Sequence, residues 1–188
     1  MGIVTLRKIS SASFQSTLYT EFFKKIYSIG IKKFVESTIQ KFSVITNSEA
    51  IVETRMATCE QVCQNRASYI VSFIPSLFDI SKREVMNQEI KDIQDQSLET
   101  KAESIIAAQR GMAARPSRLN DLRQLEVPTL FVYGKNDPRI SVEVALAQAM
   151  EASHDEILLL DHVAHMSHIE ERDYVRPRLA NFVSTCYL

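Results

Sequence analysis

Glycine is scarce in this sequence: the 188 residues contain only four glycines, about a third of ordinary usage. Glycine-rich loops hold the phosphates of nucleotides because the backbone must come close to the ligand there. Neither common loop, G-x-x-x-x-G-K-[ST] or G-x-G-x-x-G, can be written from the glycines present, which are Gly2, Gly30, Gly111 and Gly134. Nucleotide binding through such loops is therefore excluded.

Cysteines and long apolar runs are also few. The three cysteines are an odd number, and Cys59 and Cys63 lie one helical turn apart, which indicates core positions and not a disulfide framework. We therefore expect a reducing compartment and no bound metal or cofactor. The longest apolar runs have about five residues, whereas a membrane span needs about 20, and no signal-peptide apolar region is visible. These observations predict a cytoplasmic protein without a membrane partner.

The charge of the chain is nearly balanced, with a formal net value of -1. A nucleic-acid-binding protein usually has a strong basic excess, so no nucleic-acid partner is expected. Residues 1–41 nevertheless hold seven Lys or Arg and two acids. Amphipathic helices are predicted over residues 14–29 and 31–42, and most of this positive charge lies off their apolar faces. A solvated helix surface is the favoured interpretation; an acidic partner or a membrane surface is the alternative.

Apolar spacing predicts a short strand over residues 2–9, followed by residues 14–113 that are almost entirely helical. Asn47 or Ser48 can cap a helix in this part of the chain. Its predicted inward positions are Ile51, Val52, Met56, Cys59, Val62 and Cys63. Two capping-box patterns predict the starts of two further helices; these are Ser81 with Glu84 and Thr100 with Glu103.

After Pro116 the pattern changes to alternating strands and helices. Two continuous apolar runs predict buried strands, and the first ends in a turn. Such an alternation is typical of a parallel sheet with right-handed crossovers. The predicted elements are a strand over 127–133, a turn over 134–138, a helix over 142–152 capped by Ser141, a strand over 156–161 and a helix over 173–184.

The loops after these two strands contain an acid and several histidines. Asp137 follows the first strand, whereas His162, His165 and His168 follow the second. The carboxyl ends of parallel strands meet at one edge of a sheet, so we expect these side chains to lie close together. In a nucleophile-histidine-acid triad the acid orients the imidazole, which moves the proton of the nucleophile. Three histidines could also bind a metal, but the zincin pattern is missing and no metal is predicted.

Two stretches, VPTLFVYGKND at 127–137 and HMSHIE at 165–170, resemble the C-terminal half of α/β-hydrolase-fold enzymes. The stretch GMAARP at 111–116 is similar to the end of the cap in 3-oxoadipate enol-lactonase-like members. The resemblance implies an α/β fold, namely the C-terminal part of an α/β-hydrolase parallel sheet with a large helical cap. It makes Asp137 the triad acid and His165 the general base. The implied divisions are a sheet strand and loop over 1–13, the helical cap over 14–116 and a C-terminal core segment over 117–188.

The nucleophile is the missing part of this pattern. The family places a serine on a sharp elbow, G-x-S-x-G, and the sequence contains no such motif. In the favoured interpretation residues 2–9 are the sixth strand and the elbow lies upstream. In the alternative, residues 3–9 are the fifth strand and Ser13 is the nucleophile of a degenerate elbow, with Ser11 and Gln15 at the glycine positions.

The function implied by the resemblance is hydrolysis of a small ester or lactone by a nucleophile-His-Asp triad, without a cofactor. The alternative is a catalytically inactive fragment or pseudoenzyme that acts as an interaction module, for which self-association through an exposed sheet edge is expected. Five aromatic residues of the cap either line a substrate pocket or pack between helices; these are Phe22, Phe23, Tyr69, Phe73 and Phe78.

Overall fold

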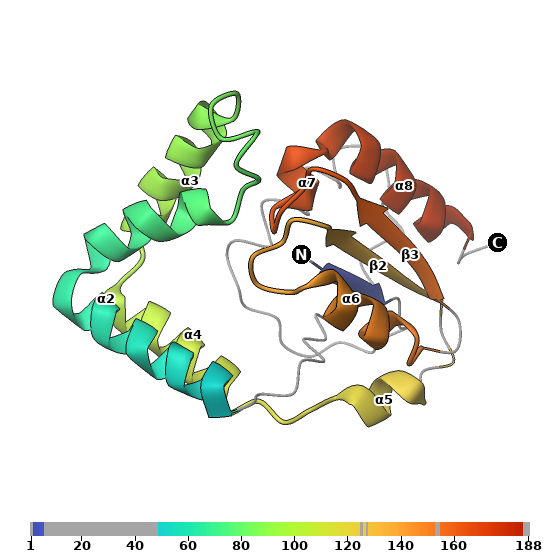
Figure 1. The fold of residues 1–188 in the computed structure, drawn as a ribbon, viewed down its shortest axis with the longest axis horizontal. Coiled ribbons are helices and arrows are strands. Elements are labelled where there is room, and N and C mark those ends of the chain that lie inside the picture. The colour runs from blue at the N-terminus through green and yellow to red at the C-terminus, as the bar shows by residue number, and fades with distance from the viewer. Residues whose placement is uncertain (1, 6–48, 125, 127, 153–154, 186–188) are drawn as a thin grey trace.

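The computed structural model describes residues 2–5, 49–124, 126, 128–152 and 155–185 (Figure 1). Ser13, the predicted helices over 14–29 and 31–42, and Cys186 lie outside these ranges. Helices α2 to α4 form one group, and a small sheet with α5 to α8 forms the other. The elements are β1 (Gly2–Thr5), α2 (Glu49–Ser76), α3 (Asn87–Leu98), α4 (Ala102–Ala113), α5 (Leu119–Arg123), β2 (Thr129–Gly134), α6 (Val142–Ala149), β3 (Asp155–Leu160), α7 (Ser167–Glu170) and α8 (Arg172–Thr185).

The described sheet has the strand order β1-β2-β3. β2 and β3 run parallel, with Thr129 opposite Asp155, and α6 connects them as the predicted crossover helix. Ser141 caps α6 as expected, because its hydroxyl oxygen accepts the N–H of Val144 at 3.4 Å. The parallel pair predicted from the two apolar runs is confirmed.

The direction of the first strand differs from the prediction. β1 pairs with β2 in the antiparallel sense, with Gly2 opposite Val132. This direction differs from the parallel one expected of a sixth or fifth strand in the two interpretations of residues 2–9 and 3–9. A β-rich sequence predicts that a strand forms, but its direction depends on the path of the chain that connects it to its neighbour.

β2 forms the centre of the core because helices cover both of its faces. Alternate side chains point to opposite faces of a strand. Leu130 and Val132 pack with Val175 and Phe182 of α8. On the other face, two stacked rings pack with Leu122 of α5 and with the alanines of α6; the rings are Phe131 and Tyr133. All six residues of β2 are consequently buried.

β3 is buried only in its carboxyl-terminal half. Leu158 and Leu160 are buried, whereas Ile157 is 38% exposed and the two residues before it are also exposed. The prediction of a fully buried strand is therefore wrong for the first half of β3. β2 has a strand on each side, but β3 is the last strand of the sheet within the described ranges, so less of its surface is covered.

α2 is bent at Asn65, whose backbone angles of φ −156° and ψ 88° are not helical. The side-chain oxygen of Asn65 accepts the N–H of Ser68 at 3.0 Å, which is the hydrogen bond of a helix N-cap. The bend divides α2 into a first arm, residues 49–64, and a second arm, residues 66–76 (Figure 1). α2 packs against both α3 and α4.

Cys59 is buried as predicted, and its sulfur lies 3.9 Å from the carbonyl oxygen of Ile106 in α4. Cys63 is exposed, so its predicted core position is wrong. The covered stripe of α2 continues instead through Val62 to Arg66, which donates to the carbonyls of Leu98, at the end of α3, and Thr100, in the turn before α4. Apolar spacing allows a step of three or of four residues, and the neighbouring helix decides between them.

A helix begins near one of the two predicted capping boxes, but neither box forms its side-chain capping hydrogen bond. α4 begins at Ala102, close to the start expected from Thr100. Residues 80–86 form turns instead of the helix expected from Ser81, and α3 begins only at Asn87. The Ser81 hydroxyl donates to the carboxylate of Asp79 at 2.5 Å, a local bond that competes with capping. None of the helices in the described ranges has the length and hydropathy needed to span a membrane.

Candidate active site

β2 ends at Gly134, where the chain passes directly against the loop that follows β3. A Cβ atom at this position would lie 2.2 Å from the carbonyl oxygens of Val163 and Ala164, a distance that real Cβ atoms do not adopt. Beyond the strands, the N–H of Asn136 donates to the carbonyl of Val163 at 2.9 Å. Glycine at 134 thus allows the two loops to lie side by side.

These loops bring Asp137 and His165 together. Nδ1 of His165 lies 3.0 Å from Oδ2 and 3.2 Å from Oδ1 of Asp137. Oδ1 also accepts the backbone N–H groups of Arg139 at 2.7 Å and Ile140 at 3.2 Å. The Asp137 side chain is fully buried, whereas 27% of the His165 side chain is exposed. The pair therefore has an enclosed acid and an accessible imidazole.

The electrostatics of the pair favour a charged acid. Burial raises the pKa of Asp137, but the hydrogen bond and charge of His165 and the N–H groups of Arg139 and Ile140 lower it more, so the net pKa lies below the ordinary value. Asp137 is thus ionised at neutral pH and accepts the proton carried by Nδ1 of His165. This arrangement leaves Nε2 as the nitrogen that can take a proton.

A third carboxylate, Glu170 of α7, holds the loop around His165. It is 5% exposed and accepts the backbone N–H groups of Ala164 and Met166, each at 3.1 Å. It also accepts the N–H of Asp79 at 2.8 Å. The sequence places Glu170 five residues after His165, but nothing in the pattern indicated that its carboxylate would be buried and bonded to the residues on both sides of the histidine.

The loop after α2 contacts both strand-end loops. The N–H of His165 donates to the carbonyl of Leu77 at 2.9 Å. The buried carboxylate of Asp79 accepts the side-chain amide of Asn136 at 2.6 Å. Hydrogen bonds from Ser81 are the largest cause of the lowered pKa of Asp79. The helical part of the chain is therefore bonded directly to the loops that carry the Asp137–His165 pair, a connection that sequence reasoning missed.

The other predicted residues lie apart from this pair or outside the described ranges. His162 is exposed and has a backbone φ of 53°. Among the described residues, no three His, Cys, Asp or Glu side chains gather in a way that could hold a metal ion. Ser13, the candidate nucleophile, lies outside the described ranges. The structure thus brings together the predicted acid and base.

Comparison with known proteins gives no match to a family model and none to a curated sequence. Solved structures do match. An esterase from Thermogutta terrifontis superposes with a TM-score of 0.70 at 23% identity, over 77% of this chain and 54% of that one. An enol-lactonase from Burkholderia xenovorans LB400 superposes with a TM-score of 0.65 at 17% identity, over 70% of this chain and 50% of the lactonase. MenH from S. aureus superposes with a TM-score of 0.63 at 16% identity, over 95% of this chain and 80% of MenH.

The described chain therefore has part of an α/β-hydrolase fold with a helical cap. The superfamily resemblance seen in the two C-terminal stretches is confirmed at the level of the fold. The chain spans about half the length of the esterase and the enol-lactonase that it matches. At these identities the comparison defines architecture, and chemistry must be argued from the residues.

Proposed function

We propose that this chain supplies the acid and the general base of a hydrolase that acts on small esters or lactones. One observation carries the proposal: Nδ1 of His165 lies 3.0 Å from the buried, ionised Asp137, on loops at the carboxyl ends of two parallel strands. The known esterase and enol-lactonase structures support the reaction class through their fold. In this proposal residues 1–13, 14–116 and 117–188 are the sheet strand and loop, the cap and the core segment.

The proposed reaction uses Nε2 of His165 twice. It first takes the proton of a serine hydroxyl while the serine oxygen attacks the ester carbonyl, and it then gives that proton to the departing alcohol. A water molecule next loses a proton to Nε2 and attacks the acyl-serine. Nε2 then gives that proton to the departing serine oxygen, so the acid is released and both the serine hydroxyl and the neutral imidazole are restored. Asp137 holds the ring and stabilises its positive charge in both halves. For a lactone, the departing alcohol stays attached to the product.

The nucleophile is either Ser13 or a serine on an upstream elbow. Labelling with a fluorophosphonate probe, together with hydrolysis of p-nitrophenyl acetate, tests both possibilities on the purified 188-residue chain. If Ser13 is the nucleophile, we expect labelling and hydrolysis that Ser13→Ala, Asp137→Ala and His165→Ala each abolish. The matched control is His162→Asn, because His162 is exposed on the same loop and Asn tolerates its positive φ.

Activity that persists at the wild-type rate in His165→Ala would contradict the proposed mechanism. If the chain is not labelled, the same two assays on the protein extended by its upstream reading frame test the other possibility, and His165→Ala must abolish that activity. An extended protein without hydrolytic activity would favour the catalytically inactive interaction module.

A further inference from the structure

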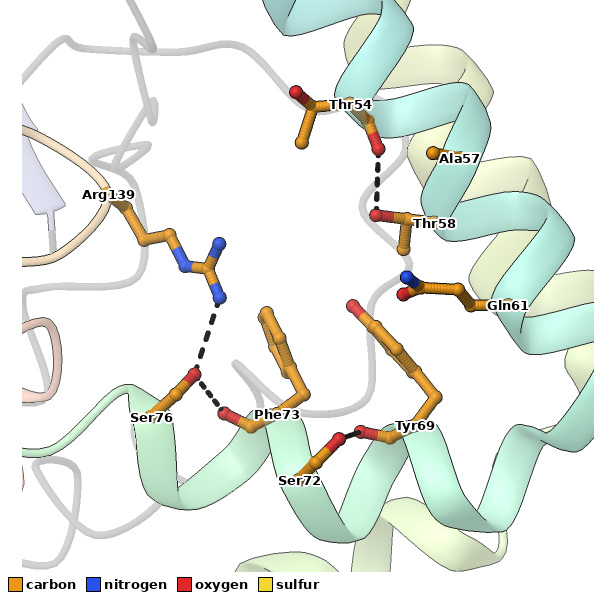
Figure 2. Close-up of a pocket in the computed structure, with 9 residues that line it drawn as sticks. All are labelled: Thr54, Ala57, Thr58, Gln61, Tyr69, Ser72, Phe73, Ser76 and Arg139. Carbon is orange, nitrogen blue, oxygen red and sulfur yellow. Dashed lines mark hydrogen bonds between the residues drawn. The ribbon is translucent and has the colours of Figure 1, made fainter.

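A pocket of about 320 Å³ lies in the angle between the two arms of α2 (Figure 2). The bend at Asn65 creates this angle, and Arg139, from the loop after β2, points into it. The pocket is thus formed by both parts of the structure. Its lining consists of Thr54, Ala57, Thr58 and Gln61 from the first arm, Tyr69, Ser72, Phe73 and Ser76 from the second arm, and Arg139.

Arg139 is the charged residue of this lining, which contains no carboxylate. The guanidinium carbon lies 4.8 Å from the centre of the Phe73 ring, and Nη2 donates to the Ser76 hydroxyl at 3.3 Å. Within the described part of the chain, no acid lies close enough to Arg139 to form an ion pair. A guanidinium has five N–H donors, so most of those on Arg139 remain available to a ligand.

The hydroxyls of the pocket already donate to carbonyls of their own helix. Thr58 donates to Thr54 at 2.9 Å, for example, and Ser76 donates to Phe73 at 2.6 Å. Two other lining side chains, Gln61 and Tyr69, have donors without a described partner. Burial raises the pKa of Tyr69, so its hydroxyl keeps its proton at neutral pH. The donors open to a ligand are therefore the guanidinium, an amide and a phenol.

Further positive charge lies close to the pocket. Arg55 follows the lining residue Thr54 in the first arm, and its pKa is lowered by burial and also by the charges of Arg115 and Arg139. Arginine nevertheless stays protonated in proteins. The charges of Arg139 and Arg55 also act on Tyr69, where they oppose part of the rise in its pKa. The potential in the pocket consequently favours a negatively charged ligand.

We infer that this pocket binds a carboxylate group of the substrate, with Arg139 as its main partner. The planar guanidinium matches the two oxygens of a carboxylate, and the rings of Phe73 and Tyr69 provide apolar surface for an attached organic body. This inference rests on the proposed function and narrows it to esters or lactones that carry an acid group. Arg139 is suitably placed, because it lies two residues after Asp137 and its N–H group is bonded to that carboxylate.

Binding of a matched pair of probes tests the inference on the 188-residue chain. Hexanoate and hexanamide have the same carbon chain and differ in charge, and isothermal titration measures both. We expect hexanoate to bind more tightly than hexanamide. Arg139→Gln should weaken hexanoate binding by roughly tenfold and leave hexanamide unchanged, which also shows that the pocket is intact. Arg139→Lys should lie between, because it keeps the charge but loses the planar fork.

Arg176→Gln is the control, since Arg176 is exposed on α8, and hexanoate binding should not change. The inference is overturned if neither probe binds, if the two bind equally, or if Arg139→Gln keeps full preference for hexanoate. If hexanoate binds as expected but no hydrolysis depends on His165, the proposed function is overturned and the carboxylate site is not.

Discussion

The Asp137–His165 loops and the pocket between the arms of α2 differ in how fully their polar groups are hydrogen-bonded within the protein. In the loops, each buried carboxylate accepts several hydrogen bonds from the protein, as Glu170 does from three backbone N–H groups. In the pocket, Arg139, Gln61 and Tyr69 keep donors that no described residue uses. The loops are therefore organised before a ligand arrives, whereas the pocket has hydrogen-bonding capacity reserved for one.

The largest expected effect comes from forcing the two loops apart. Gly134→Ala places a Cβ 2.2 Å from two backbone oxygens, and neither loop can move without losing its hydrogen bonds. We expect a loss of about 3 kcal/mol in the free energy of unfolding, measured with urea. The control, Gly111→Ala, lies inside α4 with open space around it and should stabilise the chain by about 0.5 to 1 kcal/mol. Equal effects of the two variants would contradict this view of Gly134.

The next largest effect comes from removing the carboxylate that holds the histidine loop. Glu170→Ala leaves three N–H groups without their acceptor, two of them beside His165. About 2 to 3 kcal/mol should be lost on urea unfolding, because buried donors without partners are costly. Glu171→Ala is the matched control. It breaks the partly exposed pair with Lys82 and should cost less than about 1 kcal/mol. If both variants lower the free energy of unfolding equally, Glu170 does not hold the histidine loop as proposed.

The charge of Asp137 should make stability depend on pH. Its folded-state pKa is lowered, so its contribution is present above the unfolded pKa, near 4, and is lost as pH falls through the lower folded pKa. A hydrogen bond to a charged group contributes about 1.5 to 3 kcal/mol to the free energy of unfolding. We expect the free energy of unfolding, measured with urea, to fall less between pH 7 and pH 3 in Asp137→Asn than in wild type. Asp79 titrates in the same direction and remains in both proteins. If the free energy of unfolding falls equally in both proteins, the ionised Asp137 carboxylate does not stabilise the fold as proposed.

The smallest effect concerns the bend that forms the pocket. Asn65→Ala removes the cap of the second arm, which should cost about 1 kcal/mol on urea unfolding. If the arms then straighten, hexanoate and hexanamide should both bind more weakly. Asn87→Ala is the control because Asn87 is exposed at the start of α3 and is not part of the pocket lining. Unaltered binding of both probes would show that the pocket does not depend on the cap.

The pairing of Asp137 and His165 could be predicted because it follows from local patterns. Two apolar runs indicate parallel strands, and their carboxyl ends must meet at one edge of the sheet. Arg139 was not singled out, because an arginine in a turn gives no local sign of which helix it will face. The bend at Asn65 was missed for a similar reason, since apolar spacing continues on both sides of it.

The sequence by itself determined the two parallel strands, the loops after them and the acid and histidine that those loops carry. These features depend on residues close together in the chain, whose apolar pattern records which side is buried. Only the tertiary structure decided the direction of β1, the exposure of Cys63 and the partners of Glu170. The bond from the N–H of Asp79 to Glu170 joins residues 91 positions apart, and such contacts exist only once the whole chain has folded. Arg139 and the residues of α2 are also distant in the chain, so the sequence could not predict that they form one candidate carboxylate site.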